Sequence, residues 1–487
     1  MARINITGVS DSRSAAAAGK LINEKGGQWL VVTETYTTAV DMAADLSFFV
    51  DKRIFLMPKE EHFFVVYEAR SRENLLQRLE IIKTLARGVE CVVVASAGSL
   101  TKKLPPKDVF LKAALSLSVG EEIFLEETMG NLVDMGYERV SKIYGQGQFA
   151  VRGDIVDIFT PYDQLPVRLE LFDTEIESMR SFDPVTQRSI HKMDAMEIFP
   201  AALLIRQEEA FERAKKKICR QYKSVPKRCQ QLLDNIEQMT NLQNLEAYME
   251  YFYPDAAMLW DYLAADGKVI VNDPNRCREY LQVLSQEFDA DFEVYQEQKR
   301  VTAQDHKIGI FTEALDTLFQ DRSKSGIWFL TLFPRSIKGV DSLDRLENFQ
   351  TRQVLSYNGR MDMLKTDLQR YVKDGYKVYI VCAGQERTKN MEEFLSREQL
   401  AGVVWVVTGT LSAGMELVDQ KKCYITDNDI FGFPKKIRKK RKTSSKNSSP
   451  IKAFSEIKEG DFVVHENHGI GKYMGLEQLQ EIGRAHV

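Results

Sequence analysis

Short apolar runs alternate with amphipathic stretches through residues 1–117, and this pattern constrains the fold more than any other feature. The runs Trp29–Val32, Ile54–Leu56 and Cys91–Ala95 have the length and the apolar character of buried strands. Ser71–Leu85 instead carries apolar residues at helical spacing. Strands that alternate with helices form parallel sheets, because each return to the same sheet edge needs a crossover. We therefore expect residues 1–117 to form the first part of an α/β domain with a parallel sheet.

The pattern changes several times along the rest of the chain, and 487 residues are too many for a single core. The sequence predicts an α/β multidomain protein. After residues 1–117 we expect a small β-rich insert at 118–198, the second part of the α/β domain with long helices at 199–345, a further small α/β domain at 346–430, a basic linker at 431–455 and a β-hairpin that begins a small barrel at 456–480.

Charge is distributed unevenly. The net charge is −4, yet residues 431–450 carry eight Lys or Arg and no acid, so the remainder carries −12. An acidic body argues against extended nucleic-acid binding, because phosphate contacts need clustered cations. The basic segment is interpreted as a solvated linker, with a weak DNA contact through residues 435–446 as the alternative.

The cysteines and the apolar runs exclude several classes of protein. The six cysteines lie far apart with no C-x-x-C pair and no histidine at ligand spacing, so we expect free thiols in a reducing compartment and no metal site. The N-terminus has no apolar core behind a basic start, and no run approaches the roughly 20 residues of a membrane span. We expect a cytoplasmic protein without membrane contact.

A phosphate-binding loop of the form G-x-x-x-x-G-K-[ST] is absent from the sequence. Its expected place, after the first strand, reads Gly8-Val9-Ser10-Asp11-Ser12-Arg13-Ser14-Ala15. This resembles the GVTGSGKT loop of the excinuclease component UvrB, with the later glycines, the Lys and the Thr replaced. Gly8, Asp11, Ser14 and Ala15 then mark a degenerate nucleotide loop, and Asp11 places an anion where phosphate would lie. We expect a chain without catalytic residues that binds no cofactor.

The region from Leu132 to Ser189 carries a second and longer resemblance. It contains F-A-V-R-G-D-I-V-D-I-F and V-R-L-E-L-F. It resembles the domain that UvrB shares with the bacterial transcription-repair coupling factors (Mfd), through which both bind the excinuclease component UvrA. The resemblance assigns Arg152, Arg168 and Phe172 to that interface.

Strand geometry agrees, because Arg168, Glu170 and Phe172 would share one face of a strand and Leu169 and Leu171 the other. Arginine and aromatic residues are common in interface hot spots. The alternative interpretation is structural: Phe172 packs at the edge of the core, and Arg168 pairs with Glu170 or Asp173.

Near the C-terminus, GDFVVHENHGIGKYMGLEQL resembles the start of the RNA-polymerase-interacting domain of coupling factors. This resemblance implies a contact with the polymerase beta subunit through Tyr473, Leu476 and Leu479. Residues 481–487 do not continue the family pattern and match the translation of a sequencing adapter, so we expect a non-native tail on a truncated chain. Full-length coupling factors continue with a motor that uses ATP and Mg²⁺ to translocate along DNA.

The sequence is compatible with three functions. The resemblance favours an adaptor that recruits UvrA to stalled RNA polymerase in transcription-coupled nucleotide excision repair. The first alternative is an active UvrB-like helicase or excinuclease component, which the missing Lys-[ST] pair disfavours. The second is a polymerase-binding regulator of the CarD type, which shares the hairpin but lacks the long α/β region before it.

Overall fold

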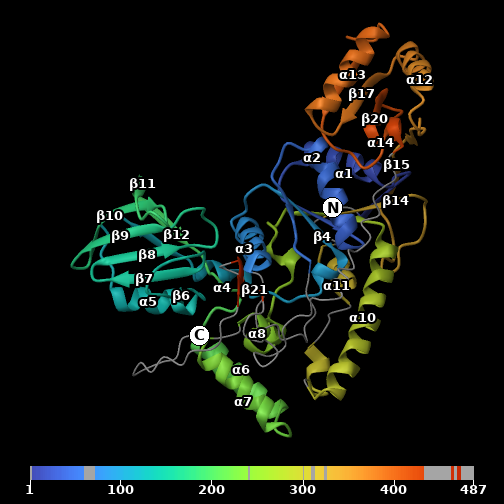
Figure 1. Cartoon of the computed structure of the whole chain (residues 1–487). Helices are drawn as coiled ribbons and strands as arrows, with labels where there is room; N and C mark the ends of the chain where they lie inside the picture. The colour runs from blue at the N-terminus through green and yellow to red at the C-terminus, as the bar shows by residue number, and fades with distance from the viewer. Residues whose placement is uncertain are drawn as a thin grey trace. The chain divides into compact units, whose positions relative to one another are not determined.

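The computed structural model describes residues 3–59, 72–239, 242–299, 301–308, 313–322, 326–432, 462–465 and 469–472. The chain divides into two compact units, residues 1–432 and residues 433–487. The elements of each unit are drawn in Figure 1. Among the described residues, no helix combines the length and the apolar character needed to cross a bilayer.

A seven-stranded sheet forms the centre of the first unit, and all of its strand pairs are parallel. Its order is β15-β1-β14-β13-β2-β4-β3. The strands are β1 (Arg3–Thr7), β2 (Trp29–Thr33), β3 (Ile54–Leu56), β4 (Val92–Ser96), β13 (Lys268–Asn272), β14 (Ile327–Thr331) and β15 (Arg345–Asn348). The parallel sheet predicted from the first 117 residues is thus confirmed, and strands from much later in the chain complete it.

Helices cover both faces of this sheet, as a parallel sheet requires. On one face, α1 (Ser12–Lys25) and α2 (Tyr36–Phe49) pack against Val31, Val94 and Ile270. On the other face, α3 (Arg72–Ala86), α10 (Pro274–Glu297) and α11 (Ala314–Asp321) pack against the alternate strand residues, among them Val32, Val93 and Val271. The connections also contain α4 (Lys107–Lys112) and three 3-10 turns, Ala97–Leu100, Leu259–Tyr262 and Asp305–Ile308.

A second, largely antiparallel sheet lies between the two halves of the first in sequence. Its order is β11-β10-β9-β8-β7-β6, and only β6 pairs in parallel. Its strands are β6 (Glu138–Arg139), β7 (Gln148–Arg152), β8 (Ile155–Phe159), β9 (Val167–Phe172), β10 (Glu175–Phe182) and β11 (Ser189–Met193). Helix α5 (Leu125–Asp134) covers one face, and a two-stranded ribbon of β5 (Leu115–Ser118) and β12 (Ala195–Ile198) contributes to the same core. The other face carries polar side chains and a small apolar cluster of Ile143, Ala150 and Phe159.

Helices follow the second sheet in sequence, as expected from the charged stretch after residue 199. They are α6 (Glu208–Gln221), α7 (Pro226–Glu237), α8 (Leu242–Leu245) and α9 (Met249–Phe252), with a 3-10 turn at Glu246–Tyr248. Pro226 begins α7, where its missing N–H costs no helical hydrogen bond.

A third, five-stranded sheet has the order β16-β19-β20-β17-β18. Its elements are β16 (Thr351–Gln353), α12 (Met361–Lys373), β17 (Lys377–Cys382), α13 (Gln385–Arg397), β18 (Val404–Thr408), β19 (Met415–Leu417), β20 (Lys422–Thr426) and α14 (Asp427–Phe431). In the second unit, β21 (Phe462–His465) and β22 (Gly469–Lys472) form the antiparallel hairpin predicted there.

Candidate functional site

The strand β9 presents the predicted interface residues as its amino-acid alternation requires. Val167, Leu169 and Leu171 are buried in the core under α5. Arg168, Glu170 and Phe172 point to the opposite side, which we call the outer face of the six-stranded sheet. Arg152 ends β7 and lies on the same face, because its strand neighbour Val151 packs against the core. The predicted division of β9 into an apolar and a polar side is confirmed.

A buried carboxylate, Asp157 of β8, joins the two arginines. The Arg168 Nε donates to Asp157 Oδ1 at 2.6 Å, and the Arg168 Nη2 donates to Oδ2 at 2.9 Å. The Arg152 Nη2 donates to the same Oδ2 at 2.6 Å. β-sheet register explains the meeting, since Asp157 lies directly opposite Arg168 on the neighbouring strand. The pairing positions both guanidinium groups on one side of the sheet.

Arg168 is held more tightly than Arg152. Its side chain is only 13% exposed, against 45% for Arg152. The Arg168 guanidinium also donates to Gln187 at 2.8 Å and lies 4.3 Å from the centre of the Phe182 ring. Hydrogen bonds to Asp157 raise the pKa of Arg168, so the group keeps its charge.

The partners that the structural alternative gave to Arg168 are wrong. Glu170 accepts hydrogen bonds from Arg180 and from the Ser178 hydroxyl, and Asp157 takes its place beside Arg168. A bulge between Ile176 and Ser178 shifts the register of β10 and brings Ser178 opposite Glu170. Sequence spacing could not show this, because both partners come from neighbouring strands.

Phe172 is the most exposed of the three predicted residues, at 74%. It ends β9 immediately before the tight turn at Asp173, whose φ of 58° lies in the left-handed region. The other expectation of the structural alternative, that Phe172 packs at the edge of the core, is therefore wrong. Exposed aromatic rings and arginines on one face are the residue types that interface centres favour.

A second exposed ring, Phe124, was missed by the sequence analysis. The amide of Ile123 donates to the Thr174 carbonyl at 2.8 Å. Glu122 forms an antiparallel backbone β-bridge with Glu175, and Glu175 lies opposite Phe172. Phe124 and Glu122 are exposed while Ile123 is buried, so the two point away from the core beside the β9–β10 turn. The sequence did offer a signal for this residue, since Phe124 is an aromatic residue in an otherwise acidic stretch just before α5.

The segment that follows β1 contains Gly8 and Asp11 in the loop, and Ser14 and Ala15 in the first turn of α1. Gly8 has a φ of 87°, and a Cβ there would lie 2.8 Å from the Asn348 side chain. Asp11 is exposed at the start of α1, whereas Ser14 and Ala15 are buried. The amides of Arg13 and Ser14, in the first turn of α1, donate to the carbonyls of Ser10 and Asp11.

Residues 412–417 of the third sheet region pack against the start of α1 and against α2. The Ser12 hydroxyl donates to the Ala413 carbonyl at 2.6 Å, and Ala16 packs against Met415 and Leu417. The buried Asp45 of α2 accepts the Ser412 amide at 2.7 Å and its hydroxyl at 2.6 Å.

Burial raises the pKa of Asp45 to about 6. The hydrogen bonds from Ser412 lower this pKa, whereas the nearby charges of Asp41 and Asp11 raise it. The start of α1 is therefore both covered and negatively charged.

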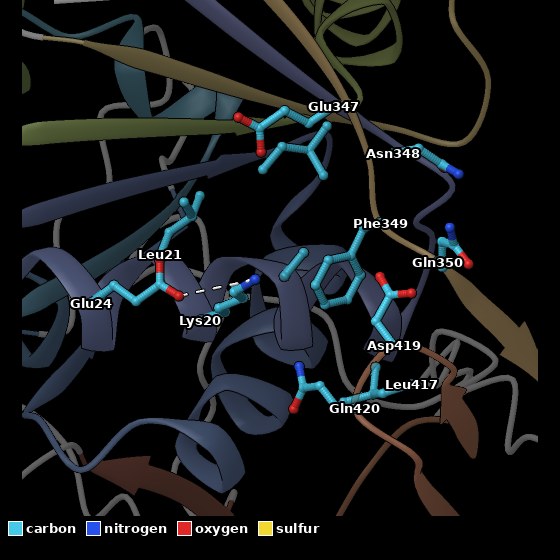
Figure 2. Close-up of a pocket in the computed structure, with 12 residues that line it drawn as sticks. Lys20, Leu21, Glu24, Glu347, Asn348, Phe349, Gln350, Leu417, Asp419 and Gln420 are labelled. Carbon is cyan, nitrogen blue, oxygen red and sulfur yellow. Dashed lines mark ion pairs between the residues drawn. The ribbon is translucent and has the colours of Figure 1, made fainter.

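A pocket of about 150 Å³ is lined by α1, by residues 347–350 and by residues 417–420. Figure 2 shows Lys20 and Glu24 of α1 paired there, with Glu347 and Asp419 among the lining carboxylates. The excess of carboxylates makes this pocket a poor site for phosphate. Among the described residues, no three His, Cys, Asp or Glu side chains are grouped to hold a metal ion.

Two protein-family models match the chain. Residues 115–204 match the UvrB interaction domain, and residues 457–486 match the CarD-like/TRCF RID domain. The first match contains the six-stranded sheet with Arg152, Arg168 and Phe172, and thus defines the class: a chain with a region similar to UvrB interaction domains.

The relatives narrow the class further. The chain is 30% identical to the transcription-repair-coupling factor of Bacillus subtilis (strain 168) over 98% of its own length. It is 27% identical to that of Staphylococcus aureus (strain MRSA252) and 26% identical to that of strain USA300, each over 99% of its length. It spans 42% of the length of each of these relatives. The resemblance inferred from the sequence is confirmed.

Several expected features lie outside the described residues. They are Tyr473, Leu476 and Leu479, the basic segment 435–446 and residues 481–487.

Proposed function

We propose that this chain is part of a transcription-repair coupling factor of the cytoplasm and acts as an adaptor that recruits UvrA to stalled RNA polymerase. The observation that carries the proposal is the outer face of the six-stranded sheet, which presents exposed Phe172 and two arginines held by one buried carboxylate. The match to the UvrB interaction domain over residues 115–204 and the coupling-factor relatives support the same partner.

The three residues have different tasks in this proposal. Phe172 is the anchor that enters a pocket of the partner, because most of its ring is free of contacts within the chain. Arg152, at the edge of the face, pairs with a partner carboxylate and contributes to encounter. Arg168 is a positioning residue that holds the outer face in shape. Its guanidinium is already engaged by hydrogen bonds to Asp157 and Gln187 and by the Phe182 ring.

The test measures binding of the whole chain to UvrA in low and in moderate salt. Phe172→Ala should lose on the order of 2 kcal/mol of binding free energy or more, as expected for a hot spot. Arg152→Ala should mainly slow association and weaken the salt dependence. Arg168→Ala should reduce both binding and the stability of the sheet.

Tyr144→Ala is the matched control. Tyr144 is as exposed as Phe172, at 77%, but it precedes β7 and so lies at the opposite end of the sheet from the β9–β10 turn. Wild-type binding by the folded Phe172→Ala and Arg152→Ala variants would show that the outer face is not the interface.

The second partner in this proposal is the RNA polymerase beta subunit, contacted through residues 456–480 as the start of a barrel. The hairpin β21–β22 and the match of residues 457–486 support that assignment. A weak DNA contact through residues 435–446 belongs to the proposal as well, supported by their charge.

The β1–α1 loop has, in this proposal, lost its nucleotide. The absence of a Lys-[ST] pair, the acidic surroundings of Asp11 and the hydrogen bond from Ser12 to Ala413 support a degenerate P-loop fold. These observations favour the adaptor over an active UvrB-like helicase. The long α/β region disfavours a CarD-type regulator.

A further inference from the structure

Two cysteines meet between neighbouring helices far in sequence from the outer face. Cys219 lies in the last turn of α6, and Cys229 lies in the first turns of α7. Their sulfur atoms are 4.0 Å apart. Both are free thiols, and Cys219 is exposed while Cys229 is half-buried.

The helix pair holds the two thiols in place. Lys215 of α6 is 3.0 Å from Glu212 and 3.8 Å from Glu237 of α7, which ties the two helices on one side. The connecting turn is short, and the Val225 amide donates to the Tyr222 carbonyl within it. A disulfide has an S–S distance of roughly 2 Å, so the two sulfur atoms, already neighbours, must approach further to form one.

The two thiols differ in their access to solvent. Residues 213–230 contain eight Lys or Arg and no Asp or Glu, so the segment that carries both thiols is basic. Burial raises the pKa of Cys229, and the hydrogen bond to Cys219 raises it further. Exposed Cys219 is therefore the thiol that an oxidant reaches first, and Cys229 is the second thiol.

We propose that Cys219 and Cys229 form a redox-active dithiol that hydrogen peroxide converts reversibly into an intrachain disulfide joining α6 to α7. The four remaining cysteines take no part. Cys91, Cys277, Cys382 and Cys423 are buried, which withholds them from the oxidant.

The reaction has two balanced steps. The Cys219 thiolate attacks one peroxide oxygen, so that an S–O bond forms, the O–O bond breaks and hydroxide leaves as water after protonation. The Cys229 sulfur then attacks the Cys219 sulfur and gives up its proton, so that the S–S bond forms and the sulfenic oxygen leaves with that proton as a second water. The two sulfur atoms lose two electrons in total, and the peroxide gains them.

The experiment treats the whole chain with hydrogen peroxide, blocks the remaining thiols and digests it with trypsin without reductant. Trypsin cleaves between the cysteines, after Lys223 and Lys227, so a disulfide is detected as two peptides that separate only on reduction. We expect the count of titratable thiols to fall from six to four and to return to six with dithiothreitol.

Single variants test the order of the steps. Cys229→Ser should leave a sulfenic acid at Cys219 that dimedone traps, whereas Cys219→Ser should react more slowly and form no intrachain bridge. Both replacements are small and lie at the surface or half-buried, and thermal unfolding of the reduced variants checks their fold. Peroxide that leaves all six thiols intact, or that produces only overoxidised or intermolecular products in the wild-type chain, would overturn the proposal.

Discussion

At the level of single residues, Asp157 shows how one buried group organises a surface. Its side chain is 3% exposed and accepts hydrogen bonds from both Arg152 and Arg168. A buried carboxylate needs such partners, because its desolvation would otherwise cost several kcal/mol. The geometry of the outer face therefore depends on a residue that no partner protein needs to touch.

Replacing Asp157 tests this dependence. Asp157→Ala should lower the free energy of unfolding by on the order of 2 kcal/mol, because Arg168 would keep a largely buried charge without its partner. Urea denaturation measures the change. The exposed neighbour Asp154→Ala is the control and should change stability little. Equal effects of the two substitutions would contradict the anchoring role.

Asp45 makes a prediction about pH. Its folded pKa, about 6, lies above its ordinary value of 3.8, so the folded state binds more protons than the unfolded state between these values. Stability contributed here should therefore fall as pH rises from about 4 to about 6, and the loss is complete above that range.

Urea denaturation at about pH 5 and about pH 7 should show a larger fall in stability for wild type than for Asp45→Asn, which cannot ionise. Ser412→Ala is a second control: it removes one hydrogen bond to the carboxylate and should leave Asp45 titratable. An unchanged pH dependence in Asp45→Asn would show that another group dominates this window.

At the level of elements, α2 positions Asp45 and begins with a capping box. The Thr38 amide donates to the Thr35 hydroxyl at 3.2 Å, and the Thr35 amide donates to the Thr38 hydroxyl at 2.9 Å. These bonds satisfy amides that the first turn of a helix leaves free. The helix thus starts at a defined residue and presents Asp45 to Ser412.

Removal of the cap should weaken the element. Thr35→Ala should cost about 1 kcal/mol of stability, because the Thr38 amide loses its side-chain acceptor. Thr37→Ala, in the same turn but exposed, is the matched control and should cost less. Thermal unfolding of the two variants provides the comparison, and a smaller loss for Thr35→Ala than for Thr37→Ala would contradict the capping role.

At the level of the whole molecule, the third sheet region packs against α1 and α2, the helices on one face of the first sheet. Ser12, Ala16 and Asp45 contact residues 412–417 there. Where nucleotide-binding folds leave the helix start open to phosphate, this chain covers it with its own backbone.

The expected consequence is that Mg-ATP does not bind to this chain. Calorimetry should show no heat of binding, because the loop offers no Lys and presents Asp11 to a phosphate. The excinuclease component UvrB, whose GVTGSGKT loop has the complete motif, is the positive control. Micromolar binding by the intact chain would contradict the expectation and favour the enzyme alternative.

The local pattern of residues was sufficient for the parallel sheet, for the helices after residue 199 and for the two sides of β9. These depend on periodicity between close neighbours, which any sequence displays directly. Partners across strands and domains required the tertiary structure. Arg168 meets Asp157, eleven residues away, through strand register, and Ser12 meets Ala413, 401 residues away, through the packing of two sheets. The contact of Cys219 with Cys229 likewise depends on how α6 and α7 cross, and helical periodicity alone does not specify a crossing.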